Sequence, residues 1–180
     1  MNMGAIFDWD GVVIDSSRYH EESWERLAEK ENKQLPDNYF KKSFGMRNEN
    51  IIPDVLNWTQ DENEIKRLSD LKEELYRKII LDRGLSPLPG VKRFLETLRT
   101  NNIPCAIGSS TPRLNITTAL RILDFEKYFQ AIVAAEDVTR GKPDPQVFLI
   151  AVQKLNLSPE CCLVFEDAHV GIQAAHAGGM

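Results

Sequence analysis

A chain of 180 residues with 42% hydrophobic side chains is long enough to bury a core in one or two compact units. Its formal net charge of -5, with 22 Lys and Arg, argues against a broad nucleic-acid-binding face, and no apolar run approaches the roughly 20 residues of a membrane span. The N-terminus lacks a signal-peptide pattern, and the 3 cysteines have no Cys-x-x-Cys spacing. We therefore expect a cytoplasmic protein with reduced thiols.

Short apolar runs and amphipathic helices alternate along most of the chain. The runs that predict buried strands are residues 5–7, 105–108, 131–135 and 162–165. Helical faces with i, i+3, i+4, i+7 spacing fall at residues 91–98, 116–123 and 148–155. This alternation predicts right-handed βαβ units and an α/β fold, with a parallel sheet covered by helices on both faces.

The segment from residue 16 to about residue 84 interrupts the alternation. It contains no convincing strand, but it carries helical faces around Trp24 and Leu68. The stretch "GLSPLPG" at residues 84–90 is rich in residues that end helices and is a plausible return to the sheet. We expect a catalytic core made of residues 1–15 and 86–180, with residues 16–85 forming a helical cap placed to act as a lid.

Two carboxylates stand where the first predicted strand ends, in the stretch "IFDWDG". Ligands bind at the carboxyl ends of strands in open α/β sheets, so Asp8 and Asp10 are candidate site residues. An Asp-x-Asp pair alone also fits a solvated turn. The residues after the later strands therefore have to show whether Asp8 and Asp10 belong to a ligand-binding site or to a solvated turn.

Each later strand is followed by further polar groups. "GSSTPR" offers hydroxyls and backbone N–H groups where a helix begins, which suits a phosphate. "RGKPDP" offers one ammonium group, and "FEDAHVG" offers two carboxylates. Aspartyl phosphoryl transfer needs a hard cation, a fixed ammonium and an acid/base beside the nucleophile. The residues that supply these groups are Ser109, Ser110, Thr111, Lys142, Glu166 and Asp167.

The motifs "DWDGV", "SST", "GKPDP" and "FEDAHVGIQAA", in this order, resemble those of the haloacid dehalogenase superfamily of phosphatases and phosphomutases. The resemblance covers essentially the whole chain. It implies a Rossmann-like core with a helical cap inserted after the first strand. Members of this superfamily normally continue with another strand and helix, so we expect the C-terminal edge of the sheet to be truncated here.

The resemblance implies a role for each matching residue of the core. Asp8 would be the nucleophile, and Asp10 would be the general acid/base that distinguishes phosphoryl transfer from halide chemistry. Ser109, Ser110 and Lys142 would bind the transferred phosphoryl group, and Lys142 would also steady Asp8.

The resemblance also implies a Mg²⁺ cofactor. The cation would be held by the Asp8 side chain, the Asp10 backbone carbonyl and Asp167. Glu166 would be a nearby partner of the metal or of its water.

Within the superfamily, the insert resembles the β-phosphoglucomutase-like subgroup through "IDSSRYHEESWERLAE" and "LKEELYRKII". This implies His20, Arg47 and Lys72 as substrate-binding cap residues. The residue pattern leaves alternatives open: His20 shares a helical face with Trp24, as a core histidine would, and Lys72 fits a solvated position on a charged helix. Trp24 is interpreted as a core residue.

Two departures from the mutase pattern guide the functional prediction. Pro112-Arg113 stands where the mutase pattern has Lys-Asn, and the cap arginine is shifted by one position. We predict a Mg²⁺-dependent phosphatase of a small phosphorylated metabolite, such as a sugar phosphate. A β-phosphoglucomutase-like mutase is the alternative enzyme, and a poorly active fragment or metabolite-binding protein is the non-catalytic alternative.

Overall fold

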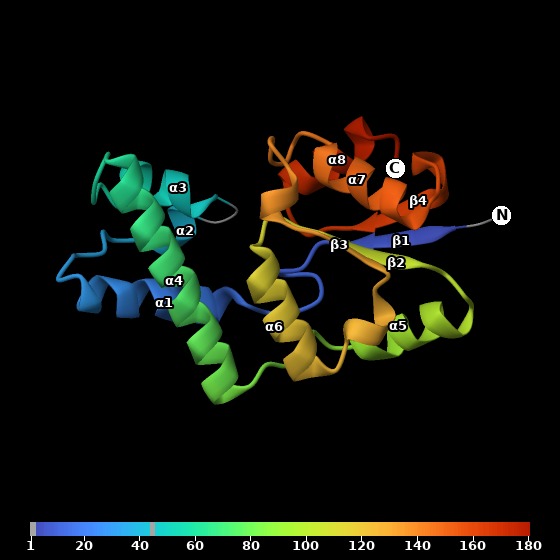
Figure 1. Ribbon diagram of the computed structural model, residues 1–180, viewed down its shortest axis with the longest axis horizontal. Helices are drawn as coiled ribbons and strands as arrows, with labels where there is room; N and C mark the ends of the chain where they lie inside the picture. The colour runs from blue at the N-terminus through green and yellow to red at the C-terminus, as the bar shows by residue number, and fades with distance from the viewer. Residues whose placement is uncertain (1–2, 44–45) are drawn as a thin grey trace. The chain divides into compact units, whose positions relative to one another are not determined.

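The computed structural model describes residues 3–43 and 46–180 of a chain that divides into two compact units. We call Met1–Ser16 together with Leu85–Met180 the core unit, and Ser17–Gly84 the cap unit. Figure 1 shows the sheet in the core unit, whereas the described residues of the cap unit form helices, turns and loops.

The core unit is built on a parallel sheet with the strand order β3-β2-β1-β4. Its strands are β1 (Gly4–Phe7), β2 (Cys105–Gly108), β3 (Ala131–Val133) and β4 (Cys162–Phe165). In the sheet register, Phe7 of β1 lies opposite Ile107 of β2 and Phe165 of β4. Because every strand pair is parallel, the carboxyl ends of all four strands meet at one edge. The predicted α/β class is confirmed.

Helices cover both faces of this sheet, with α7 and α8 on one side and α5 and α6 on the other (Figure 1). Their bounds are α5 Val91–Thr100, α6 Arg113–Leu123, α7 Gln146–Leu155 and α8 His169–Ala177. Three short 3₁₀ turns connect the elements, at Glu126–Tyr128, Ala135–Asp137 and Pro159–Cys161.

The central strand β1 is buried on both faces, which explains its unbroken apolar run. Ile6 belongs to the core cluster that includes Phe148 of α7 and Ala174 of α8. Phe7 points to the opposite face, where its ring stacks on Phe165 with a centroid distance of 4.7 Å. Successive side chains of a strand alternate between faces, so β1 joins the two layers of the core.

The third strand is shorter than its apolar sequence predicts. The run of residues 131–135 was expected to be strand throughout, but β3 ends at Val133 and a 3₁₀ turn begins at Ala135. The Asp137 carboxylate accepts a hydrogen bond from the Ala134 N–H at 2.8 Å and so closes this turn. A side chain that bonds to nearby backbone competes with the sheet ladder, and here it ends the strand.

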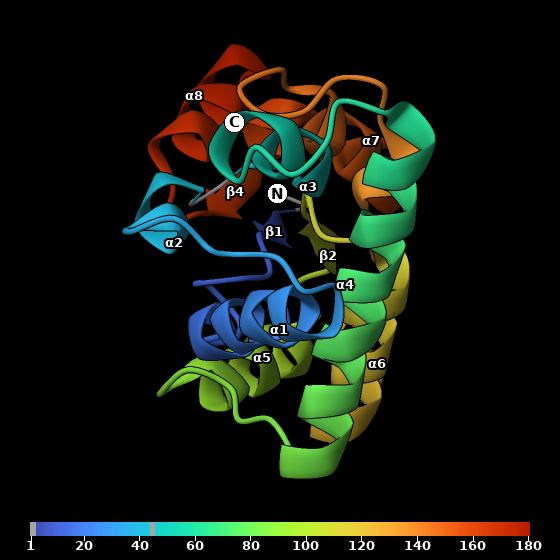
Figure 2. The same ribbon diagram turned by 90° about the vertical axis from the view of Figure 1, so that its left-hand side faces the viewer.

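The cap unit packs two long helices around an apolar cluster. α1 (Ser17–Lys30) lies against α4 (Glu62–Arg83) in both views of the ribbon (Figures 1 and 2). Shorter segments complete the unit: α2 (Tyr39–Lys42), α3 (Asn48–Asn50) and a π-helical turn at Ile51–Val55. The cluster between them contains Trp24, Leu27, Ile52 and Leu68. Trp24 is 2% exposed, so its interpretation as a core residue is confirmed.

Local sequence signals fix both ends of α4. Asp61 stands at the N-cap, where its side chain accepts a hydrogen bond from the Glu64 N–H at 2.8 Å. At the other end, Gly84 has a φ of 76°, a conformation that side-chain-bearing residues rarely adopt. The helix therefore stops where the chain returns to the core unit.

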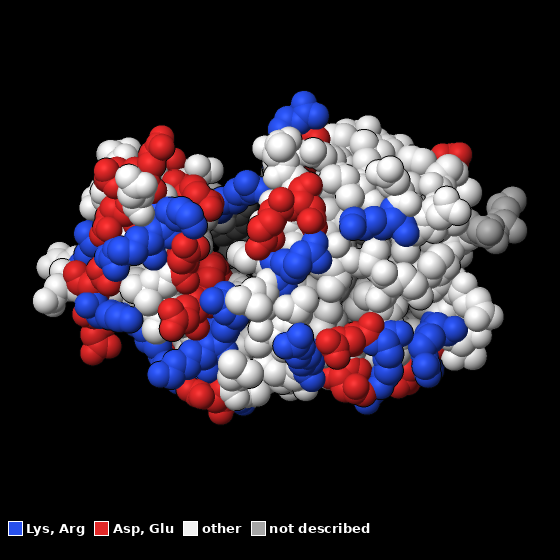
Figure 3. Space-filling view, viewed as in Figure 1, with Lys and Arg blue, Asp and Glu red and all other residues white. Residues whose placement is uncertain are grey.

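Charged side chains of both signs are interspersed on the face drawn in Figure 3. Ion pairs between neighbouring residues of the cap unit include Arg67 with Glu64 and Lys66 with Asp70. Among the described residues, every helix is too short or too polar to cross a membrane.

The packing of α6 makes a matched pair of substitutions informative. Ile116 is fully buried, whereas Leu114 on the same helix is 55% exposed. Ile116→Ala should lower the free energy of unfolding by about 2–5 kcal/mol because it opens a cavity, and Leu114→Ala should change it by less than about 0.5 kcal/mol. Urea unfolding followed by circular dichroism measures both values. Equal losses for the two variants would contradict this packing.

Candidate active site

Polar side chains from the loops that follow the four strands come together in the core unit. Asp8 follows β1, Ser109 follows β2, Lys142 lies in the loop after β3, and Glu166 and Asp167 follow β4. Interactions that join Asp8 to Ser109, Lys142 and Glu166 show that these strand ends form one site. The parallel sheet thus gathers residues that are more than 150 positions apart in the chain.

Lys142 connects two of the carboxylates in this site. Its Nζ lies 3.1 Å from Asp8 Oδ1 and 2.6 Å from Glu166 Oε2, and it also lies 4.9 Å from the centre of the Phe148 ring. The side chains of Lys142 and Glu166 are only 7% and 2% exposed. Removing one partner of such a buried pair leaves an uncompensated charge. The lysine is therefore fixed in the site and does not move freely on the surface.

Negative charge is concentrated around Asp8. The pKa of Asp8 is raised to about 6, mainly because the carboxyl group is buried; the Glu166 and Asp10 carboxylates add to this rise, and Lys142 opposes it. Burial and Glu166 also raise the pKa of Asp167 above its ordinary value. The positive charge of Lys142 does not balance the carboxylates of Asp8, Asp10, Glu166 and Asp167. The site therefore favours the binding of an additional cation.

The donor set of this cluster fits a hard divalent cation. Carboxylate oxygens of Asp8, Glu166 and Asp167 all lie within 4.8 Å of one another. Gly11 permits this arrangement, because a Cβ at that position would lie 2.1 Å from Asp167 Oδ2. Mg²⁺ prefers oxygen ligands of this kind. Three of the four residues predicted to bind metal thus come together here, and the role of the Asp10 backbone carbonyl stays a prediction.

The Asp10 carboxylate has a partner that sequence reasoning missed. The Thr111 hydroxyl donates a hydrogen bond to Asp10 Oδ2. Thr111 was expected only as part of the hydroxyl loop, and nothing in a linear sequence indicates a partner 101 residues away. This contact brings the loop after β2 directly onto the second aspartate.

The loop after β2 differs in detail from its sequence prediction. The N–H groups of Ser109 to Thr111 were expected at the start of a helix, but α6 begins only at Arg113. The Ser109 N–H donates to the Val133 carbonyl at 3.0 Å, and the Thr111 N–H donates to Ser109 Oγ at 3.3 Å. The Ser109 side chain lowers the pKa of the neighbouring Asp8 carboxyl group, whereas Ser110 is exposed. The hydroxyls and the Ser110 amide are thus the groups of this loop that suit a phosphate.

Pro112 and Arg113, which replace the Lys-Asn pair of the mutase pattern, stand at the start of α6. The Arg113 guanidinium is paired with Asp137 and donates to the Ile132 carbonyl at 3.3 Å. The backbone N–H of Arg113, which is the first of α6, donates to a Glu136 carboxylate oxygen at 3.0 Å. The positive groups at this helix start are therefore engaged by acidic residues of the chain itself.

In the cap unit, Lys72 is part of a buried polar cluster. It is 3% exposed, and its Nζ lies 2.7 Å from His20 Nδ1 and 2.9 Å from Glu73 Oε1. The His20 ring stacks on Tyr76 with a centroid distance of 4.2 Å. The interpretation of Lys72 as a solvated helix residue is wrong, because its ammonium is bound between His20 and Glu73.

Glu73 is a second residue that the sequence analysis did not identify. Its Oε1 accepts a hydrogen bond from Asn48 Nδ2 at 2.7 Å in addition to its bond with Lys72. Although burial alone would raise it, the pKa of Glu73 is lowered to about 2, because Lys72, His20 and Asn48 all favour its ionised form. The ionised carboxylate therefore belongs to the folded state of the cap unit.

Arg47 lies beside this cluster in the chain, at the N-cap of α3. Its Nε and Nη2 atoms are buried without a hydrogen-bond partner among the described residues. Buried guanidinium donors normally find partners. The cap arginine is therefore a candidate for an anionic or hydroxyl-bearing ligand.

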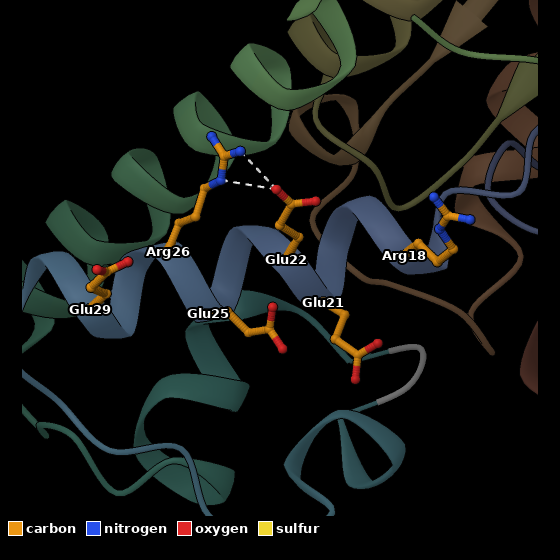
Figure 4. Close-up of a pocket in the computed structure, with 6 residues that line it drawn as sticks. All are labelled: Arg18, Glu21, Glu22, Glu25, Arg26 and Glu29. Atoms are coloured by element: carbon orange, nitrogen blue, oxygen red, sulfur yellow. Dashed lines mark hydrogen bonds and ion pairs between the residues drawn. The ribbon is translucent and has the colours of Figure 1, made fainter. Parts of the chain in front are cut away.

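A separate groove runs along α1 in the cap unit (Figure 4). Figure 4 shows Glu22 and Arg26 directed toward α4, where they form an ion pair with each other, while Glu21 and Glu25 point to the opposite side. Glu22 also pairs with Arg83 of α4. None of the predicted site residues lines this groove, which consists of Arg18, Glu21, Glu22, Glu25, Arg26 and Glu29.

Known proteins match this chain over nearly its whole length. The family model described as haloacid dehalogenase-like hydrolase matches residues 3–179. A chloroplastic 5-amino-6-(5-phospho-D-ribitylamino)uracil phosphatase of Arabidopsis thaliana is 40% identical over 99% of this chain, but the match covers 48% of that protein. The chain thus spans about half the length of this relative.

Two further matches extend over most of both chains. A phosphorylated carbohydrates phosphatase of Thermotoga maritima is 32% identical over 98% of this chain and 81% of that protein. The crystal structure of a β-phosphoglucomutase from Clostridium difficile superposes with a TM-score of 0.86 at 28% identity, covering 100% of this chain and 82% of that one.

The Glu73 cluster predicts a specific dependence of stability on pH. A folded-state pKa near 2 lies below the ordinary value of 4.5, so the stabilisation is fully present above about pH 4.5 and is lost as the pH falls toward 2. Glu73→Gln should lower the free energy of unfolding at neutral pH by an amount on the order of 1–3 kcal/mol. Urea unfolding in a series of buffers from neutral to acidic should show this deficit shrinking as the pH falls.

The matched control is Glu74→Gln, since Glu74 is the exposed neighbour on the same helix. Its effect should be small at every pH. A Glu73→Gln deficit that stays constant between neutral pH and about pH 3 would contradict an ionised, lysine-paired Glu73.

Proposed function

Because the chain belongs to the haloacid dehalogenase-like hydrolase family, within its β-phosphoglucomutase-like subgroup, we propose that it is a Mg²⁺-dependent phosphatase of a small phosphorylated metabolite. The family predicted from the motifs is confirmed, and with it the prediction of an enzyme of the phosphoric monoester hydrolase class. The observation that carries the proposal is the buried Lys142 between Asp8 and Glu166, beside the carboxylate of Asp167.

Asp8 is the proposed nucleophile. One of its carboxylate oxygens would attack the phosphorus of the substrate, the bond from phosphorus to the leaving oxygen would break, and an aspartyl phosphate would form. Lys142 holds the Asp8 carboxylate through its 3.1 Å ion pair and supplies positive charge for an incoming phosphate dianion. Positioning and charge stabilisation are the main contributions a protein makes to phosphoryl transfer.

Mg²⁺ would be held by Asp8 and Asp167, with Glu166 nearby, and when bound it would neutralise phosphate charge next to the nucleophile. The Ser109 and Ser110 hydroxyls would bind the phosphoryl oxygens, since both lie in the loop after β2 and Ser109 interacts with Asp8. These assignments use only side chains of the core unit.

Asp10 is the proposed general acid/base. It would give its proton to the leaving oxygen in the first step and take a proton from the attacking water in the second. The water oxygen would then bond to phosphorus, and inorganic phosphate would leave as the Asp8 carboxylate is restored. Its position two residues after Asp8 and its contact with the Thr111 hydroxyl support this role.

The proposed substrate class is a phosphorylated sugar or sugar-like metabolite. Two relatives of this chain are named for such chemistry, a phosphorylated carbohydrates phosphatase and a phosphatase of a ribitylamino compound. In the cap unit, His20, Arg47 and Lys72 are polar groups suited to recognising the hydroxyl-bearing part of the substrate.

Hydrolysis is favoured over a mutase reaction by the start of α6. A mutase must also bind a second phosphate, and the Pro112-Arg113 departure removes the expected polar pair. Here the Arg113 guanidinium and its backbone N–H are engaged by Asp137 and Glu136. A second phosphate would have to displace these carboxylates.

The first test of this function is phosphate release with Mg²⁺ from a panel of sugar phosphates. Asp8→Asn should lower turnover by roughly 10³-fold or more, because the amide cannot form the acyl phosphate. Asp15→Asn is the matched control, since Asp15 is exposed in the same segment and should leave turnover unchanged. Substantial phosphate release by the Asp8 variant would contradict the nucleophile.

The same panel separates hydrolase from mutase. Incubation of β-glucose 1-phosphate with a bisphosphate activator and Mg²⁺ should release inorganic phosphate with little glucose 6-phosphate. Activator-dependent glucose 6-phosphate as the main product would instead support the mutase.

The metal assignment makes a second prediction. Asp167→Asn removes a charged oxygen ligand, so a higher Mg²⁺ concentration should be needed for activity. A ligand that binds the folded chain but not the unfolded chain raises the unfolding temperature. In a thermal unfolding assay, Mg²⁺ should therefore raise the unfolding temperature of the unmodified protein and of Asp15→Asn more than that of Asp167→Asn. Full activity after treatment with EDTA, or equal stabilisation of all three proteins, would count against this site.

A further inference from the structure

The hydroxyl of Thr111 lies in the core unit in direct contact with the carboxylate proposed as general acid/base. Thr111 is 9% exposed, and its Oγ1 donates a hydrogen bond to Asp10 Oδ2. A hydrogen bond from a hydroxyl to an ionised carboxylate is charge-assisted and therefore stronger than a neutral one. The contact fixes one oxygen of the Asp10 carboxyl group in space.

The backbone that carries this hydroxyl is itself held on both sides. The Thr111 N–H donates to Ser109 Oγ at 3.3 Å, and its carbonyl accepts from the Ala135 N–H at 3.1 Å. Threonine is also branched at Cβ, which limits the rotation of its side chain. The hydroxyl therefore projects from a rigid support that links the loops after β2 and β3.

We propose that Thr111 is a positioning residue that orients the Asp10 carboxyl group for proton transfer to and from the reacting oxygen. This inference rests on the proposed phosphatase function and gives a new role to a residue that was predicted only as part of the hydroxyl loop. Proton transfer is efficient only when the acid/base is held at hydrogen-bonding distance and in the correct direction. A threonine hydroxyl has a donor hydrogen and acceptor lone pairs, so it keeps its contact with Asp10 both before and after the proton moves.

A purely structural role for Thr111 makes a different prediction. If the residue only anchored its loop, its loss would weaken phosphate binding and every step of the reaction together. If it acts through Asp10, its loss affects the steps that need a proton transfer. Phenyl phosphate has a poor leaving group that needs protonation, whereas p-nitrophenyl phosphate has a good one that does not.

The test uses the full chain with Thr111→Val, which keeps the branched shape but lacks the hydroxyl, and Thr111→Ser, which keeps the hydroxyl. For Thr111→Val, kcat with phenyl phosphate should fall roughly 10-fold or more, with KM changed less than about 2-fold. With p-nitrophenyl phosphate, the first turnover should fall less than about 3-fold and be followed by a slow steady state, because water attack still needs Asp10. Thr111→Ser should restore both steps.

Two controls define the result. Thr117→Val removes a hydroxyl from α6 that bonds only within its own helix, and it should leave all rates unchanged. In the Asp10→Asn background, Thr111→Val should have no further effect, since the group it positions is already lost. If Thr111→Val is misfolded by circular dichroism, Thr111→Ala carries the same expectations.

The outcomes separate this inference from the function it rests on. Equal losses for the two substrates in the first turnover, a dominant rise in KM, or additive losses in the Asp10→Asn background would overturn the role of Thr111 alone. Absence of phosphate release by the unmodified chain with Mg²⁺, from the panel of sugar phosphates as well as from both aryl phosphates, would overturn the proposed function and this inference together.

Discussion

The core unit depends on one buried cation, the ammonium group of Lys142, held between the carboxylates of Asp8 and Glu166. Taking these charges out of water is unfavourable, and their mutual attraction offsets this only when the geometry is kept. The geometry comes from the sheet: β1 carries Asp8 at its end, β4 carries Glu166, and the loop after β3 carries Lys142. The packing of the parallel strands therefore also determines how the charged groups of the site lie relative to one another.

The carboxylates around this lysine outnumber the positive charge that it supplies. Burial and repulsion between neighbouring carboxylates raise the pKa values of Asp8 and Asp167, and the absence of a side chain at Gly11 lets Asp167 approach without a steric clash. An arrangement of this kind is unfavourable for stability alone. A bound divalent cation would offset this repulsion, which is the physical reason that we propose this edge of the sheet as the active site.

The cap unit also contains a buried ion pair between a lysine and a carboxylate. Lys72 is buried between His20 and Glu73, and Asn48 fixes the carboxylate from its other side. These partners of Lys72 all belong to the described part of the cap unit, so the position of the ammonium group is determined within that unit. Each unit thus buries one lysine against a carboxylate, and in each the ion pair orders residues that were predicted to meet the substrate.

The sequence alone determined the sheet, the alternating helices and the identity of the polar residues at the strand ends, because apolar periodicity and turn residues are local properties. It could not determine the burial of Lys72, the engagement of Arg113 by Asp137 or the bond from Thr111 to Asp10. These contacts join residues between 1 and 101 positions apart, and they depend on how loops end and where side chains point once the elements have packed. The start of α6 and the early end of β3 were decided in the same way, by side chains that bond to backbone groups which sequence periodicity does not specify.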